Sequence, residues 1–82
     1  MDRAELQRLL RQRPFQPFRV VLSDGRRYDV RYPHMNLLAD SYINIGIPDE
    51  TGPKPLCDHT EYVRLDQIVR TELLPTAPPL AS

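Results

Sequence analysis

Phe18-Arg-Val-Val-Leu-Ser-Asp-Gly-Arg-Arg-Tyr-Asp-Val-Arg-Tyr32 decides the fold of this chain. Apolar and polar residues alternate on both sides of Asp24-Gly25, and an Asp-Gly pair between two alternating runs is a strong signal for a β-hairpin. We therefore expect strands over residues 18–23 and 26–32. Because arginines occupy polar positions of both runs, the hairpin should bury one face and present a cationic face on the other.

The segment before the hairpin predicts an amphipathic helix over residues 2–13. Its apolar stripe has helical spacing and consists of Leu6, Leu9 and Leu10. Asp2 is a candidate N-cap, and Pro14 ends the helix because proline has no backbone N–H to donate. A helix of this length is marginal by itself in water, so we expect it to pack on the sheet.

The segment after the hairpin predicts more β structure. Strands are expected at 42–47, at 56–65 with an interruption near Asp58, and at 68–73 after a one-turn connection at Asp66-Gln67. The apolar run at 35–39 is ambiguous between helix and strand.

Together these elements predict a mainly β fold with an N-terminal helix, as one domain over residues 1–74. The architecture is expected to be a small five-stranded barrel or a strongly bent antiparallel sheet. The proline-containing stretch 48–55 is interpreted as an exposed loop, and residues 75–82 as a frayed proline-rich tail.

This order of elements resembles Sm-like barrels of the SH3 type, and bacterial Hfq in particular. The likeness is carried by the helix ending in Arg-Gln-Arg-Pro14, the hairpin 20–28, Asn36-Leu-Leu38 and the segment 63–69. It implies rings in which neighbouring subunits pair strands, here near Val63–Leu65 and Leu73, and it implies RNA as a ligand. Hfq-type proteins read uridine-rich RNA with a Lys-His pair, whose place Leu65-Asp66-Gln67 takes in this chain.

A second likeness concerns the pattern Pro-Phe-x-Pro-Phe-Arg at Pro14–Arg19, which is similar to a group of small uncharacterised bacterial proteins. It implies no activity, and a shared fold does not by itself determine a function. The functional hypotheses therefore depend on the chemistry of the side chains.

The charge of the chain is balanced in total but divided along its length. Residues 1–31 hold eight arginines against four acids, whereas residues 32–82 hold three basic residues against seven acids. The first half is thus +4 and the second −4. Such a division is typical of a basic surface for an anion such as RNA, or of self-association between the two halves; a solvated surface without a partner remains the plain alternative.

The candidate RNA-binding residues are arginines of the hairpin and the helix together with one tyrosine. They are Arg8, Arg11, Arg19, Arg26, Arg27, Arg31 and Tyr42. Arginines interleaved with aromatic rings suit single-stranded nucleic acid, and Tyr62 offers a second ring. The alternative for the hairpin is cross-strand ion pairing, with Arg19 beside Asp29.

Cys57-x-His59-x-Glu61 is the other chemical pattern of the chain. Alternation in a strand would place these three side chains on one face, and His34 and Asp58 are further candidate metal ligands. Zinc sites usually carry paired cysteines, however, and a second cysteine is missing here. A cysteine nucleophile would need a third, orienting group, and none is evident. We therefore expect Cys57 to be a small core residue, no metal or cofactor, and no enzymatic activity.

The remaining predictions concern partners and location. The single cysteine permits no internal disulfide, and no run approaches the length of about 18 apolar residues that spans a bilayer. We expect a cytoplasmic protein without membrane contact that forms homo-oligomers and binds single-stranded RNA. The alternative is a protein–protein adaptor that uses the 48–55 loop.

Overall fold

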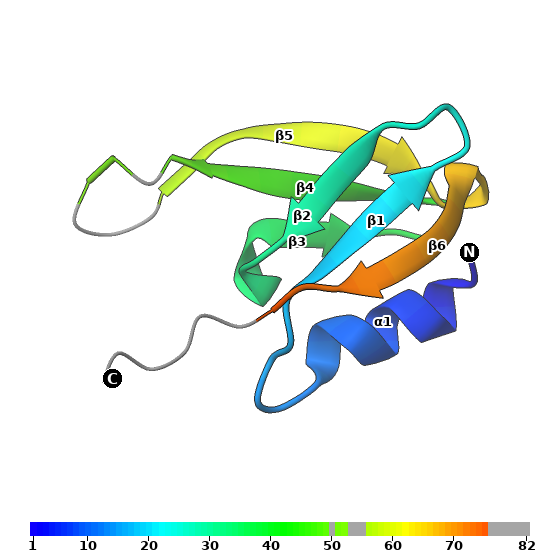
Figure 1. The fold of residues 1–82 in the computed structure, drawn as a ribbon, viewed down its shortest axis with the longest axis horizontal. Coiled ribbons are helices and arrows are strands. Elements are labelled where there is room, and N and C mark those ends of the chain that lie inside the picture. The colour runs from blue at the N-terminus through cyan, green and yellow to red at the C-terminus, as the bar shows by residue number, and fades with distance from the viewer. Residues whose placement is uncertain (50, 53–55, 76–82) are drawn as a thin grey trace.

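The computed structural model describes residues 1–49, 51–52 and 56–75. Strands from both halves of the chain form two antiparallel sheets of three strands each (Figure 1). Sheet A has the order β2 (Arg27–Val30), β1 (Phe18–Leu22) and β6 (Ile68–Leu73). Sheet B has the order β3 (Asn36–Leu38), β4 (Tyr42–Asp49) and β5 (Leu56–Arg64). Two 3₁₀ turns link the sheets, η1 (Pro33–Met35) between β2 and β3, and η2 (Leu65–Gln67) between β5 and β6.

The mainly β fold with one N-terminal helix is confirmed, whereas the prediction of five strands in a barrel is wrong. The described residues form six strands, and the two sheets do not close into a barrel. The extra strand arises at Pro33, which begins η1 and ends the pairing of the second predicted strand. The ambiguous segment at 35–39 resumes as β3, in the other sheet.

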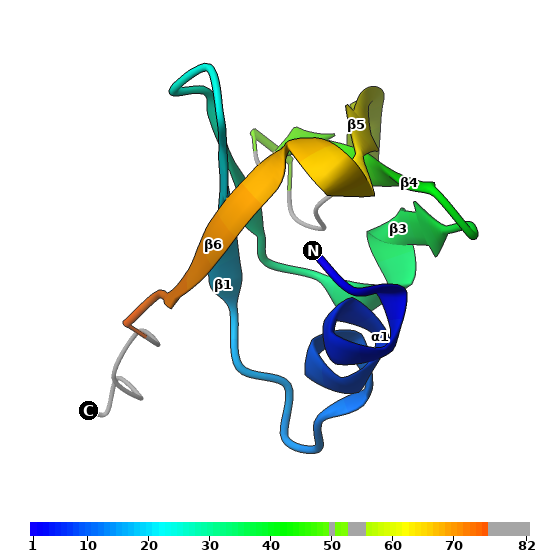
Figure 2. The ribbon, with the colours of Figure 1, turned by 90° about the vertical axis from the view of Figure 1, so that its right-hand side faces the viewer.

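Helix α1 (Arg3–Arg11) packs against the inner, buried sides of the two sheets. Asp2 is its N-cap, and the Asp2 carboxylate accepts a hydrogen bond of 3.2 Å from the backbone N–H of Ala4. Leu6 and Leu9 are buried in the core, as their spacing predicts. In Figure 2 the helix lies below β3 and beside β1 and β6. The stripe of leucines therefore covers one side of the space between the sheets.

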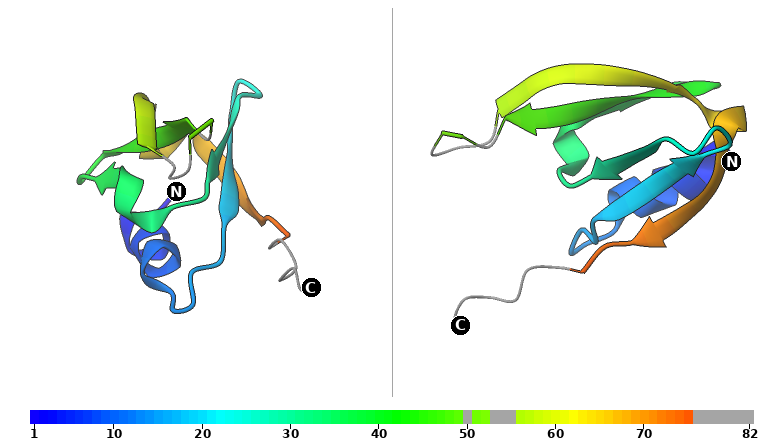
Figure 3. Two further views of the ribbon diagram at one scale, coloured as in Figure 1. Left: turned by 90° about the vertical axis from the view of Figure 1, so that its left-hand side faces the viewer. Right: turned by 45° about the horizontal axis from the view of Figure 1, so that its top comes forward.

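The core is made by the inner sides of both sheets. Sheet A contributes Phe18 and Val20, and sheet B contributes Ile43, Ile45 and Val63, all of them inaccessible to solvent. Hairpin β4–β5 extends well beyond β2 and β3 at its far end, as Figures 1 and 3 show. The far part of β5 thus lies outside the core.

The Asp-Gly turn of the first hairpin is longer than the sequence suggests. The backbone N–H of Leu22 bonds to the Arg26 carbonyl oxygen at 2.9 Å, so the connection has three residues, and Asp24-Gly25 forms its last two. Gly25 has a φ of 92°, a left-handed conformation that glycine adopts without strain. The three-residue turn sets the register that places Arg19 opposite Asp29.

Gly46 in β4 lets η1 approach sheet B closely. A Cβ atom at this position would collide with the Met35 carbonyl oxygen and would lie 2.8 Å from the Met35 Cβ and 3.2 Å from the Cys57 Sγ. A glycine inside a strand often marks such a backbone approach. The contact fixes η1 on sheet B at the point where the chain passes between the two sheets.

Two predicted segments fall partly outside the described residues. Of the predicted 48–55 loop, Pro48 and Asp49 belong to β4 and Thr51 to a short bend, whereas residues 50 and 53–55 are not described. The predicted tail is described only at Pro75. No helix in the described part of the chain is long and apolar enough to span a membrane.

Gly46→Ala should lower the free energy of unfolding by about 1–3 kcal/mol, because the added methyl group has no room against the backbone of η1. Urea unfolding followed by circular dichroism measures the change. Thr60→Ala is the matched control, since Thr60 is the exposed cross-strand neighbour of Gly46 and should change stability by less than about 0.5 kcal/mol. Equal effects of the two substitutions would contradict the packing argument.

Candidate functional site

The outer side of sheet A carries three of the seven residues of the predicted site, Arg19, Arg27 and Arg31. Directly opposed residues of antiparallel strands share a face, and Arg19 lies opposite both Asp29 and Glu72. In the next row Val21 lies between Arg27 and Arg70. We call this surface, together with Arg31 just after β2, the arginine face. Its members are Arg19, Val21, Arg27, Asp29, Arg31, Arg70 and Glu72.

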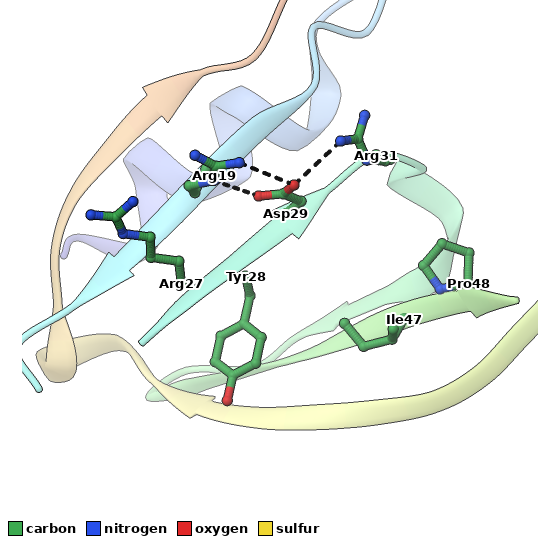
Figure 4. A pocket seen from close by; sticks show the side chains of 7 residues that line it. All are labelled: Arg19, Arg27, Tyr28, Asp29, Arg31, Ile47 and Pro48. Carbon is green, nitrogen blue, oxygen red and sulfur yellow. Dashed lines mark hydrogen bonds and ion pairs between the residues drawn. The ribbon is translucent and has the colours of Figure 1, made fainter. Parts of the chain in front are cut away.

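Ion pairs organise one part of the arginine face. Asp29 accepts from Arg19 Nε at 2.7 Å and Arg19 Nη2 at 3.4 Å, and it lies 3.3 Å from Arg31 Nη2 (Figure 4). The hydrogen bond from Arg19 holds the pKa of Asp29 below its usual range, and the same bond raises the pKa of Arg19. The expected cross-strand pair is therefore present, and it neutralises one of the hairpin arginines.

The rest of the face retains positive charge. Arg70 pairs with Glu72 of its own strand at 2.9 Å, whereas Arg27 is exposed and has no ion pair within the described residues. Four arginines stand against two acids, which leaves a net charge of +2. Val21 is buried although it lies on this outer side, since the aliphatic stems of the neighbouring arginines cover it.

A cleft of about 470 Å³ adjoins the arginine face at the free edge of β2. Three of its arginines, with Asp29, form one side, and the apolar surface of Tyr28 and β4 forms the other (Figure 4). The lining residues are Arg19, Arg27, Tyr28, Asp29, Arg31, Ile47 and Pro48. The cleft thus combines guanidinium groups with apolar and aromatic surface, and both sheets contribute to its lining.

The structure places the other predicted binding residues on different surfaces. Arg8 and Arg11 lie on α1, which packs on the buried side of β1, opposite to the arginine face. Arg26 is at the hairpin turn and pairs with Asp24 at 2.7 Å. Tyr42 lies on the outer side of sheet B and stacks on Tyr62, with 4.9 Å between ring centroids. Of the seven predicted residues, Arg19, Arg27 and Arg31 are brought together.

Sequence reasoning missed the apolar side of the cleft. Pro48 was predicted as part of a loop, and neither Tyr28 nor Ile47 was among the candidate binding residues. Tyr28 and Ile47 are half-buried, and both reach the cleft from edges of the core. The contact between β2 and β4 joins segments that are distant in the sequence, so local patterns could not predict it. The one signal for the apolar side was that the strand pattern of 42–47 could continue into Pro48.

Cys57 is exposed, so the prediction that it is a core residue is wrong. Two features of β5 explain this. First, the far end of the β4–β5 hairpin lies beyond the core (Figure 1). Second, the register shifts by one residue: His59 pairs with Ile47, but Cys57 pairs with Pro48, so that Asp58 is an extra residue in a β-bulge. β5 runs unbroken from Leu56 to Arg64, so the predicted interruption near Asp58 is present only as this bulge, which turns Cys57 to the side of Gly46, away from Glu61.

His59 is held between two carboxylates. Its Nδ1 lies 2.8 Å from an Asp58 oxygen, and its Nε2 lies 3.0 Å from a Glu61 oxygen. Glu61 also accepts a hydrogen bond of 3.5 Å from the Tyr28 hydroxyl, so the cluster connects β5 with β2. No group of three or more His, Cys, Asp or Glu side chains that could hold a metal ion occurs among the residues that the structure describes.

No protein-family model matches the chain, and neither a curated protein nor a solved structure matches it significantly. The resemblance to Sm-like barrels therefore stays a prediction. The functional interpretation depends on the geometry of the site.

The pKa of His59 should be above its usual value of 6.5, because the hydrogen bond to Asp58 and the contact with Glu61 stabilise the imidazolium ion. This raised pKa adds to folding stability at pH values below about 6.5, where the imidazolium is present in both states. The contribution is lost as the pH rises through the pKa of the folded state.

NMR titration of the imidazole protons measures this pKa, and His59→Gln assigns the signal. Asp58→Asn should lower the pKa, whereas Glu5→Gln on the exposed surface of α1 is the control and should leave it unchanged. An unchanged pKa in Asp58→Asn would show that Asp58 does not pair with the ring in solution.

Proposed function

We propose that this chain is a non-enzymatic, self-associating module that binds single-stranded RNA in the cleft beside the arginine face. The observation that carries the proposal is the pairing of guanidinium groups with apolar surface across one cleft. Single-stranded nucleic acids are bound by such a combination, because phosphates contact the cations and bases contact rings or apolar side chains.

Arg27 and Arg31 are the arginines that we assign to phosphate contacts. Arg27 has no ion pair among the described residues, and Arg31 has one long contact, at 3.3 Å, with the carboxylate that Arg19 also holds. Phosphates can therefore approach Arg27 and Arg31 separately, without breaking the shorter ion pair between Arg19 and Asp29. We assign to Arg19 the role of holding Asp29 in place.

Tyr28, Ile47 and Pro48 are assigned to the bases. They form the apolar side of the cleft, and contacts of this kind tolerate every base, since each base has an apolar face. The proposal therefore favours binding that depends little on sequence. The Lys-His pair of Hfq-type proteins is not needed for such a mode, which agrees with its replacement by Leu65-Asp66-Gln67.

Binding of a fluorescently labelled, mixed-sequence RNA oligonucleotide should weaken as salt rises, because each phosphate contact displaces counterions. Arg27→Ala should reduce the slope of log affinity against log salt concentration by about 0.7, the value for one contact with a single strand. Fluorescence anisotropy at several salt concentrations measures both quantities.

Arg64→Ala is the matched control, because it removes the same charge from a residue of β5 that pairs with Asp66 at 2.7 Å, away from the cleft. It should leave the slope unchanged. Two results count against the proposal: absence of binding at low salt, or equal losses in the Arg27 and Arg64 variants, which would indicate attraction by total charge alone.

A further inference from the structure

The outer side of sheet B is almost without charge. One row across its three strands consists of Leu37, Asn44 and Tyr62, and the next row contains Gly46 and Thr60. Arg64, which pairs with Tyr42, is the last residue of β5 on this face, and its guanidinium forms an ion pair with Asp66. More than a quarter of the residues in the chain are charged, at 27%, so a neutral face of this extent differs from the rest of the surface.

Exposed apolar side chains gather on and beside this face. Among the described residues, five large apolar side chains are more than half exposed, and Leu37 (61%), Leu56 (70%) and Tyr62 (58%) are three of them. Leu37, Leu56 and Met35 line a groove of about 580 Å³, with Cys57 and Asn44. Contiguous apolar surface of this kind is typical of protein–protein contacts.

The composition of this face selects a second copy of the chain as its occupant. In a two-fold dimer each patch meets itself, so a charged patch repels its copy and a neutral patch does not. The arginine face, with a net charge of +2, is excluded from such a contact by its own repulsion. The outer side of sheet B carries no such penalty.

The shape of this face also suits a contact with itself. A self-complementary patch needs a projection and a hollow close together, and Tyr62 projects beside the groove, sharing the row of Asn44. Tyr62 is already held in position by stacking on Tyr42, so little side-chain freedom would be lost on association. Aromatic anchors of this type are enriched in the centres of protein interfaces.

We propose that two copies pack sheet B against sheet B about a two-fold axis, with Tyr62 of each copy covering the groove of the other. The inference rests on the self-association in the proposed function and identifies its surface. It differs from the strand-edge contact near Leu73 that the Sm-like resemblance implies. The arginine face belongs to sheet A and stays open in this dimer, whereas Pro48 of the cleft lies opposite Cys57, which lines the covered groove.

Light scattering on a sizing column measures the mass, which should be twice the 9.5 kDa of one chain. Leu37→Glu should give the monomer, since a carboxylate would enter the apolar contact from each copy. Tyr62→Glu should do the same and serves as a second variant if the first fails to fold. Leu73→Glu is the matched control, because Leu73 is 67% exposed on β6, outside the groove.

The thiol of Cys57 gives an independent measurement, because it lines the groove. Its rate of reaction with a maleimide should fall as the protein concentration rises, and this dependence should vanish in Leu37→Glu. A monomeric wild-type protein overturns self-association itself. If the oligomer survives both sheet B variants but is lost in Leu73→Glu, the assignment of the contact to sheet B is wrong, while self-association itself stands. RNA binding by the monomeric variants tests the arginine cleft separately.

Discussion

The structure depends on one shared core, in which the inner sides of two open sheets face each other. Neither sheet has more than three strands, and a sheet of that size is stable in water only when its apolar face is covered. Phe18 of sheet A and Ile45 of sheet B are completely buried in that shared interior, and Leu6 of α1 closes it from the side. Most apolar positions that alternate inward are used there, although Leu73, which lies opposite Phe18, is 67% exposed. The outer sides of the sheets, and the cleft at the edge of β2, therefore remain available for contacts with other molecules.

The elements that local patterns determine were predicted correctly, apart from the length of the Asp-Gly turn and the direction of Cys57, whereas the parts that distant contacts determine were not. The helix, hairpin β1–β2, the bulge near Asp58, and the turn at η2 follow from spacing, turn residues and proline positions. Pro33 follows the second predicted strand and begins η1, which leads the chain into the other sheet. The consequence, two sheets in place of a barrel, depends on η1 packing against Gly46, and this contact joins segments that are separated in the sequence.

The same distinction applies to the candidate site. The pairing of Arg19 with Asp29 follows from the register of the hairpin, and it was foreseen as the alternative to a fully cationic face. The apolar side of the cleft could not be foreseen, because Ile47 and Pro48 reach β2 only through the arrangement of the two sheets. Strand alternation also gave the wrong direction for Cys57. The extra residue in the β5 bulge reverses the direction of the side chains that precede the bulge in this strand.

The two outer faces have opposite chemistry, and this difference bears on how binding and self-association can coexist. An exposed apolar sheet face is an aggregation hazard unless something covers it, whereas an arginine-rich face keeps its own copies apart. If both features lay on one sheet, covering the apolar side chains would bury the cations and oppose association by their repulsion. In this chain the neutral side chains lie on sheet B and the arginines on sheet A. Covering one face therefore leaves the other exposed, and a dimer would present two separate arginine faces to a single flexible strand, whose binding would gain from the second contact.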